Sequence, residues 1–298
     1  TFVLGFFMSL GKAAVYKHIP VYYPDRVGAV GGVVGLIGGL GGFILPIAFG
    51  MLNDMIGVWT SCFMLLFLIS TGSLLWMHSA ILAMESYAGV DAIAGKDLPE
   101  LASTRIAPKR PVGLAARFFG VAPTLHRWEP ENAAFWEESG KRVAYSTLII
   151  TTLNLTMAFI VWFVVSALVV RLPQIGFNLT TSQLFWLAAM PGLAGGTLRL
   201  IHMFLTPMYG TRTVVSLSTL SLLIPAIGWF YAVQDINTPY WWLMVLAFLA
   251  GLGGGNFSSF MPSTSLFFPK RMQGTALAIQ AGIGNFGVSV VQFLTPWV

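Results

Sequence analysis

The stretch from Gln183 to Tyr209 reads QLFWLAAMPGLAGGTLRLIHMFLTPMY, and it decides the fold class of the chain. An apolar run of this length can cross a bilayer as a helix, which needs about 20 residues. Arg199 lies in its middle, where a guanidinium costs about 2.5–3.5 kcal/mol on the mildest insertion scale. Arginine cannot lose its proton to avoid that cost. We therefore expect Arg199 to face a polar path or a bound anion.

The rest of the chain is equally apolar. Of its 298 residues, 56% are hydrophobic and 9% are charged, whereas about a quarter of the residues in a soluble domain are charged. This composition predicts an all-α membrane protein with about eight transmembrane helices. All eleven acidic residues lie outside the apolar runs, so no carboxylate within a run can neutralise Arg199. The predicted runs are 1–16, 27–50, 57–83, 143–170, 183–209, 213–233, 240–267 and 273–298.

The basic residues predict how the chain is oriented in the membrane. Loops with and without Lys or Arg alternate along the sequence, and positive loops stay on the cytoplasmic side. Arg171, which borders the otherwise uncharged loop 172–182, is the one cation on the opposite side, and its long side chain can reach the outer interface. The polar stretch 84–142 is rich in both charge types and falls on the positive side, so we expect a cytoplasmic linker in a multi-pass protein of the cell inner (plasma) membrane. The other positive loops contain Lys17 with Arg26, Arg212, and Lys270 with Arg271.

Several classes of function are disfavoured by the residues present. No basic face with interleaved aromatic residues suggests a nucleic-acid partner, and the net charge of +5 is a topology signal. No cluster of His, Cys, Asp and Glu and no nucleophile motif suggests an enzyme, a metal site or a cofactor. The single cysteine, Cys62, excludes a disulfide within the chain.

The chain contains an internal repeat. Residues 22–26, YYPDR, match residues 267–271, FFPKR, and a glycine-rich run follows each copy. Repeated hydrophobic segments are typical of transporters. Small residues recur four residues apart in both copies, as at Gly28 and Gly32 in the first and Gly274, Ala278 and Gly282 in the second, which favours close helix approach. Two interpretations stay open: static packing, or a smooth surface along which helices slide during transport.

Three stretches resemble the nitrate/nitrite porters of the major facilitator superfamily. They are IGFNLTTSQLFWLAAMPGLAGGTLRL at 175–200, GLGGGNFSSFMPSTSLFFPKRMQGTAL at 251–277 and AGIGNFGVSVVQ at 281–292. The segment RWEPENAAFWEESGKR at 127–142 is similar to the lead-in before the first span of such porters. Residues 11–43 are similar to the last spans of the same kind of protein. The resemblance implies a major facilitator-type helix bundle.

The order of these matches implies an unusual domain organisation, because the end of one porter precedes the start of another. We predict the middle of a tandem fusion: residues 1–83 as the last three spans of a first unit, 84–142 as the linker, and 143–298 as the first five spans of a second unit. The alternative is spans four to eleven of a single porter, with 84–142 as its central loop.

The resemblance also implies roles for individual residues. Arg199 matches a substrate-binding arginine, Phe257 an aromatic that covers the flat face of the anion, and Asn285 the asparagine of the glycine-rich signature span. His202 follows Arg199 by three residues on the same helix face, and Tyr16 is a candidate cavity aromatic. The second arginine of the family lies on a span outside this sequence.

Lys12, on the same predicted span as Tyr16, either lines a cavity or lies near a helix end. His202 departs from the aromatic expected at its position, Gln280 stands where an asparagine is expected, and Gly39 where the second copy has Asn285. These departures leave the choice between nitrate and nitrite open.

The predicted function is transport of nitrate and/or nitrite by alternating access. The alternatives are transport of another small anion, or a sensor or scaffold built on a transporter fold. Proton symport and exchange both stay open, although the lack of acids within the apolar runs favours exchange.

Overall fold

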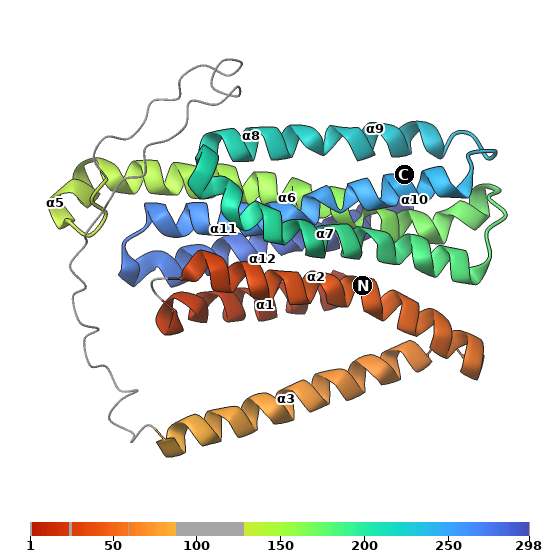
Figure 1. Cartoon of the computed structure of the whole chain (residues 1–298), viewed down its shortest axis with the longest axis horizontal. Coiled ribbons are helices and arrows are strands. Elements are labelled where there is room, and N and C mark those ends of the chain that lie inside the picture. The colour runs from red at the N-terminus through yellow and green to blue at the C-terminus, as the bar shows by residue number, and fades with distance from the viewer. Residues whose placement is uncertain (1, 24–25, 59, 88–127, 298) are drawn as a thin grey trace. The chain divides into compact units, whose positions relative to one another are not determined.

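The computed structural model describes residues 2–23, 26–58, 60–87 and 128–297 of the chain. Every regular element in these ranges is a helix, which confirms the predicted all-α class (Figure 1). The α-helices are α1 (Phe2–Tyr22), α2 (Val27–Ile56), α3 (Ser61–Tyr87), α5 (Ala133–Phe135), α6 (Lys141–Arg171), α7 (Thr181–Tyr209), α8 (Thr211–Ser221), α9 (Leu223–Ala232), α10 (Tyr240–Ala250), α11 (Leu252–Phe267) and α12 (Lys270–Leu294).

Seven helical stretches in the described part are long and apolar enough to cross a membrane. They match seven of the eight predicted runs. The remaining predicted run, 1–16, corresponds to α1. This helix has 21 residues but is not among the seven membrane-spanning candidates, and it carries Lys12, Lys17 and His18. The seven stretches are Val27–Ile56, Ser61–Ala80, Ala133–Arg171, Thr181–Thr206, Thr211–Ala232, Tyr240–Phe267 and Lys270–Leu294.

Two of these stretches are interrupted in the middle. Helices α8 and α9 meet at Leu222, just before Pro225. Proline has no N–H, so it cannot donate to the carbonyl of Ser221 and the regular ladder is broken there. Helices α10 and α11 meet at Gly251, which packs against α7 so closely that an added Cβ would lie 2.5 Å from the Cβ of Ala194.

The chain divides into two compact units, residues 1–47 with 112–298, and residues 48–111. In the smaller unit, the end of α2 and the start of α3 are joined by a short turn with Gly57 at a φ of 74°. The hydroxyl of Ser61 donates to the carbonyl of Val58 at 2.7 Å and stabilises the start of α3. Residues 88–127, the middle of the predicted linker, lie outside the described residues.

In the larger unit, α1 packs along α12, and α2 packs along α7 (Figure 1). Glycines make the second contact possible. A Cβ on Gly39 would lie 2.6 Å from the Cα of Gly196, and Gly42 faces Gly192 one turn further along. The predicted glycine stripe of α2 is therefore a helix contact in which two backbones meet directly, as small residues permit.

The glycine run 251–255 is also a packing surface. Gly254 approaches Gly195 of α7 and the indole of Trp162 on α6, each about 2.8 Å from an added Cβ, while Gly253 lies against the carbonyl of Ala158. Side chains at these positions would force α6, α7 and α11 apart. The glycines thus hold three helices around the largest buried aromatic cluster.

The residues that precede α6 form a clasp over the loop between α11 and α12. The indole of Trp128 donates to the carbonyl of Leu266 at 3.0 Å, and the Glu131 carboxylate accepts from the backbone N–H of Lys270 at 2.8 Å. A carboxylate at a helix N-terminus satisfies a free donor and complements the helix dipole. This clasp ties the start of the first span of the predicted second unit to the start of its fifth span.

Candidate functional site

Arg199 lies fully inside the larger unit. Its side chain is 1% exposed, on α7, whose start is fixed by a capping box between Thr180 and Gln183. The Nε atom donates to the carbonyl of Gly254 at 2.9 Å, and Nη1 donates to the carbonyl of Gly35. Both acceptors belong to glycines. At Gly35 an added Cβ would lie 2.9 Å from Nη1 of Arg199, so the missing side chain leaves room for the guanidinium there.

One donor group of this guanidinium has no partner. The Nη2 atom of Arg199 is buried and makes no hydrogen bond within the described residues. Nor does any carboxylate in the described ranges form an ion pair with it. Leaving a buried charged donor unpaired costs more than about 1–3 kcal/mol. The two carbonyls therefore compensate the positive charge of Arg199 only in part. This agrees with the sequence, in which no acidic residue within an apolar run can neutralise the guanidinium.

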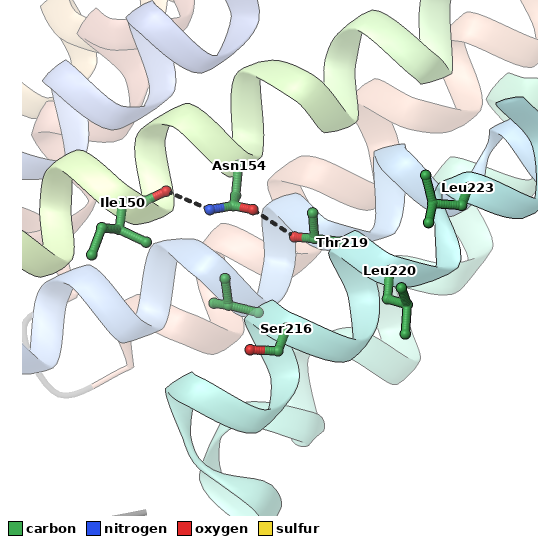
Figure 2. Close-up of a pocket in the computed structure, with 7 residues that line it drawn as sticks. Ile150, Asn154, Ser216, Thr219, Leu220 and Leu223 are labelled. Carbon is green, nitrogen blue, oxygen red and sulfur yellow. Dashed lines mark hydrogen bonds between the residues drawn. The ribbon is translucent and has the colours of Figure 1, made fainter. Parts of the chain in front are cut away.

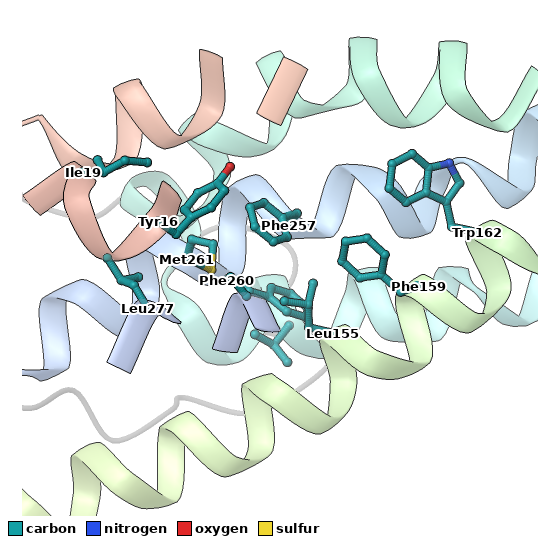
Figure 3. Close-up of a cluster of buried hydrophobic side chains, with 11 residues drawn as sticks. Tyr16, Ile19, Leu155, Phe159, Trp162, Phe257, Phe260, Met261 and Leu277 are labelled. Carbon is teal, nitrogen blue, oxygen red and sulfur yellow. The ribbon is translucent and has the colours of Figure 1, made fainter. Parts of the chain in front are cut away.

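Aromatic rings surround the guanidinium. Its Cζ atom lies 5.2 Å from the ring centroids of both Trp162 and Phe257. The Phe257 ring makes edge-to-face contacts with Tyr16 at 4.7 Å and with Phe159 at 5.9 Å between centroids. Figure 3 shows Tyr16 from α1, Phe257 from α11, and Phe159 and Trp162 from α6 side by side. The site is therefore a cation in an aromatic shell.

Tyr16 lies in the buried aromatic cluster, and its role as a cavity aromatic stays a prediction. It is 2% exposed, and its hydroxyl donates to the carbonyl of Gly31 at 2.9 Å. This bond uses the one hydroxyl proton, so Tyr16 offers its ring edge and an oxygen lone pair to the cluster.

Lys12 also reaches this cluster. It lies ten residues from either end of α1, so the alternative of a position near a helix end is wrong. Its Nζ atom lies 4.5 Å from the centroid of Phe257 and 4.8 Å from that of Phe159. These distances fall within the range of cation–π contacts, about 6 Å.

Asn285 lies beyond Lys12, on α12, and is 6% exposed. Its Oδ1 atom accepts from Lys12 at 3.5 Å, and its Nδ2 atom donates to Ser9 of α1 at 3.5 Å. Both bonds are long and join α1 to α12. Gln280, one of the departures noted in the sequence, donates to Thr151 of α6 at 2.9 Å and so serves helix packing.

His202 lies apart from the aromatic cluster, at the contact of α7 with α11. Its Nδ1 atom is 3.0 Å from the hydroxyl of Ser259. The hydroxyl of Thr206, one turn further along α7, donates to the Ser259 carbonyl at 2.8 Å. This arrangement supports a role for His202 in joining α7 to α11. A role in anion binding stays a prediction.

A separate groove of about 390 Å³ lies between α6 and α8 (Figure 2). Its polar centre is Asn154, which donates to the Ile150 carbonyl at 2.8 Å and accepts from Thr219 at 2.9 Å. No charged residue lines it, so its chemistry does not suit an anion. It contains none of the predicted site residues. The lining residues are Ile150, Asn154, Val215, Ser216, Thr219, Leu220 and Leu223.

Several contributors to the site have no signal in the sequence. Trp162 is one of ten tryptophans, and nothing in its own run marks it as the partner of Arg199. Its indole N–H donates to the carbonyl of Pro191 at 2.7 Å, which holds the ring against α7. The carbonyls of Gly35 and Gly254 also become visible only in three dimensions.

Long apolar helices that cross at glycines around the buried guanidinium of Arg199 are typical of membrane transporters of the helix-bundle type. The model of the Major Facilitator Superfamily matches residues 1–292, and the chain belongs to that family. It is a multi-pass membrane protein.

The relatives that it matches include proteins named as nitrate/nitrite transporters and antiporters. The chain is 66% identical over 171 residues to the "Probable nitrate/nitrite antiporter NarK2" of Thermus thermophilus, which covers 57% of this chain and 38% of that protein. It is 48% identical over 174 residues to the "Nitrate/nitrite transporter NarU" of Salmonella typhimurium, covering 58% and 38%.

A shorter match joins the chain to the "Probable nitrate/nitrite antiporter NarK1" of Thermus thermophilus. It is 51% identical over 83 residues, covering 28% of this chain and 19% of that protein. The chain thus spans little more than a third of the length of the first two relatives.

Proposed function

We propose that the transporter containing this chain moves nitrate and/or nitrite across the inner membrane by alternating access, and that Arg199 binds the anion. The observation that carries the proposal is the buried Nη2 atom of Arg199, which lacks a partner among the described residues. A planar oxyanion has two oxygens that can accept two parallel hydrogen bonds from the guanidinium, whereas a water molecule or a carbonyl offers a single oxygen.

The aromatic shell supports a flat substrate. The ring centroids of Phe257 and Trp162 each lie 5.2 Å from the Cζ atom of Arg199, so an anion bound to the guanidinium would lie close to aromatic rings. A ring face accommodates a planar ion of delocalised charge better than a compact, strongly hydrated one. The named activities of the relatives agree with this chemistry.

The domain organisation that we propose is the tandem fusion. The 171-residue match to one antiporter is about as long as residues 127–298, and the 83-residue match to another is as long as residues 1–83, which supports this division. The stretch 84–142 is then a cytoplasmic linker between a first and a second porter unit. The names of two relatives include antiport, and we propose exchange for this transporter as well.

Arg199→Lys in the full-length transporter tests the role of Arg199. Lysine keeps the charge but loses the planar pair of donors. We expect the loss of about 1.5–3 kcal/mol that is typical of hydrogen bonds to charged groups, or roughly a 10- to 150-fold weaker nitrate affinity. Phe257→Ala should weaken binding less and reduce the preference for planar over tetrahedral anions.

The measurement is binding or counterflow of nitrate and nitrite with the purified wild type and both variants. Arg171→Lys, at the end of α6 and away from the cluster, is the matched control. An unchanged nitrate affinity in Arg199→Lys would show that Arg199 is a structural cation and would remove it from substrate binding.

A further inference from the structure

Lys12 is a second cation at the aromatic cluster, and the proposed function does not use it. It is half-buried in the middle of α1, with its ammonium over the rings of Phe257 and Phe159. Its one hydrogen bond in the described part of the chain is the long contact of 3.5 Å to Asn285. An ammonium has three donors, so it can bind a further acceptor here.

Lys12 and Arg199 approach the same ring. The Nζ atom of Lys12 lies 4.5 Å and the Cζ atom of Arg199 lies 5.2 Å from the centroid of Phe257, so the two atoms are at most about 10 Å apart. Neither cation forms an ion pair with a carboxylate within the described ranges. Two like charges in a poorly polarisable interior repel each other, and one anion between them would relieve both.

We infer that one small oxyanion binds between Arg199 and Lys12, beside the Phe257 ring. This inference rests on the proposed function, because it extends the anion site of Arg199 to a second residue. The rigid fork of Arg199 fixes one edge of the ion, and the flexible lysine reaches another oxygen. Two charge-assisted bonds of about 2.7–2.9 Å, together with the width of the ion, span most of the separation between the cations.

The position of Lys12 has a consequence for the two predicted units. Lys12 lies in residues 1–83 and Arg199 in residues 143–298, on opposite sides of the linker in the sequence. A shared anion would make one binding site from both parts of the chain. The site is then complete only when α1 packs on α12, through the contacts of Ser9 with Asn285 and of Ala13 with Gly282.

A cross-link tests that packing independently of transport. A Cβ on Gly282 would lie 3.4 Å from the Cβ of Ala13, close to the range of about 3.5–4.5 Å in disulfides. In a full-length Cys62→Ser background, Ala13→Cys with Gly282→Cys should form a disulfide under mild oxidation. Ala14→Cys with Gly282→Cys is the control, because Ala14 is exposed. Equal cross-linking of both pairs, or of neither, would overturn the inference.

Nitrate affinity tests the role of the charge. We expect Lys12→Gln in the purified full-length transporter to bind nitrate roughly 10- to 150-fold more weakly by calorimetry, the range for a lost bond to a charged group. Lys12→Arg keeps a cation and should retain most of the affinity. Lys17→Gln, on the same helix with an exposed side chain, should bind like the wild type.

A double-mutant cycle distinguishes one shared site from two separate sites. If both cations bind the same ion, Lys12→Gln should cost less in the Arg199→Lys background than alone, because interacting residues are not additive. Fully additive losses would place the cations in separate sites and overturn the inference. An effect of Arg199→Lys without any effect of Lys12→Gln would overturn it too, while leaving the proposed function in place. No effect of either variant would end both.

Discussion

Gly39→Ala tests the direct contact between α2 and α7. A Cβ at Gly39 would lie 2.6 Å from the Cα and 3.0 Å from the N of Gly196, whereas ordinary contacts begin at 3.4 Å. The obstacle is backbone, which cannot rotate away as a side chain can. The two helices would therefore have to separate by roughly 0.8 Å at this level, and forcing atoms into a well-packed interior typically costs about 1–3 kcal/mol.

Gly38→Ala is the matched control. Gly38 is the preceding residue of the same helix, and an added Cβ there meets nothing within 4 Å. Both substitutions gain the same helix propensity, about 0.8–1 kcal/mol for alanine over glycine, so their difference isolates the contact. We expect Gly39→Ala to unfold at a temperature a few degrees below Gly38→Ala, at about 2–4 °C per kcal/mol for chains of 150–250 residues.

The assay is the apparent unfolding temperature of the purified full-length variants in detergent, followed by nitrate binding. Gly35, whose carbonyl accepts from Arg199, lies one turn from Gly39, so separation of the helices should also weaken nitrate binding in Gly39→Ala. Equal unfolding temperatures for the two variants would refute the direct crossing of α2 and α7. Equal unfolding temperatures would also argue against the hydrogen bond from Arg199 to the Gly35 carbonyl, because that bond requires α2 to lie directly against α7.

Two further predictions concern sidedness and the second buried polar residue of α7. Single cysteines at positions 178 and 212, Asn178→Cys and Arg212→Cys in a Cys62→Ser background, should be labelled by a membrane-impermeant thiol reagent from opposite sides of the membrane. In right-side-out vesicles we expect the cysteine at position 178 to react. Labelling of the cysteine at position 212 alone in these vesicles would reverse the predicted topology. His202→Gln should leave the pH profile of nitrate uptake between about pH 5.5 and 8 unchanged. The imidazole of His202 is hydrogen-bonded to Ser259 between two helices, and the amide of glutamine can replace that bond. A shifted pH profile would show that His202 takes part in the transport mechanism.

Much of the helical organisation follows from the sequence, because a bilayer fixes the length of an apolar run. The five spans expected within 143–298 all occur as helical stretches, and the burial of Arg199 follows from its depth in one of them. Its need for an acceptor was also predictable, since arginine keeps its charge. The chain supplies that acceptor in part from the carbonyls of Gly35 and Gly254.

The rotation of each helix about its axis was not predictable in the same way. A helix that is apolar all round carries no amphipathic stripe to show which face is inside, so neither Trp162 nor Lys12 could be placed beside Phe257 from periodicity. Their positions depend on glycine contacts between helices far apart in the sequence, such as Gly254 with Trp162 and Gly282 with Ala13. The glycine spacing predicts that such contacts exist but does not identify the partners.

The clasp formed by Trp128 and Glu131 has a consequence for synthesis of the protein in the cell. Glu131 accepts from the backbone of Lys270, which is 139 residues further along the chain. A ribosome adds about 5–20 residues per second, so roughly 7–28 s pass between the synthesis of Glu131 and that of Lys270. During that interval Trp128 has its ring neighbour Phe135 but still lacks its other ring neighbour, Phe267. Helix α6 is therefore synthesised before the residues that hold its N-terminal end, and the clasp can form only after the start of α12 has been made.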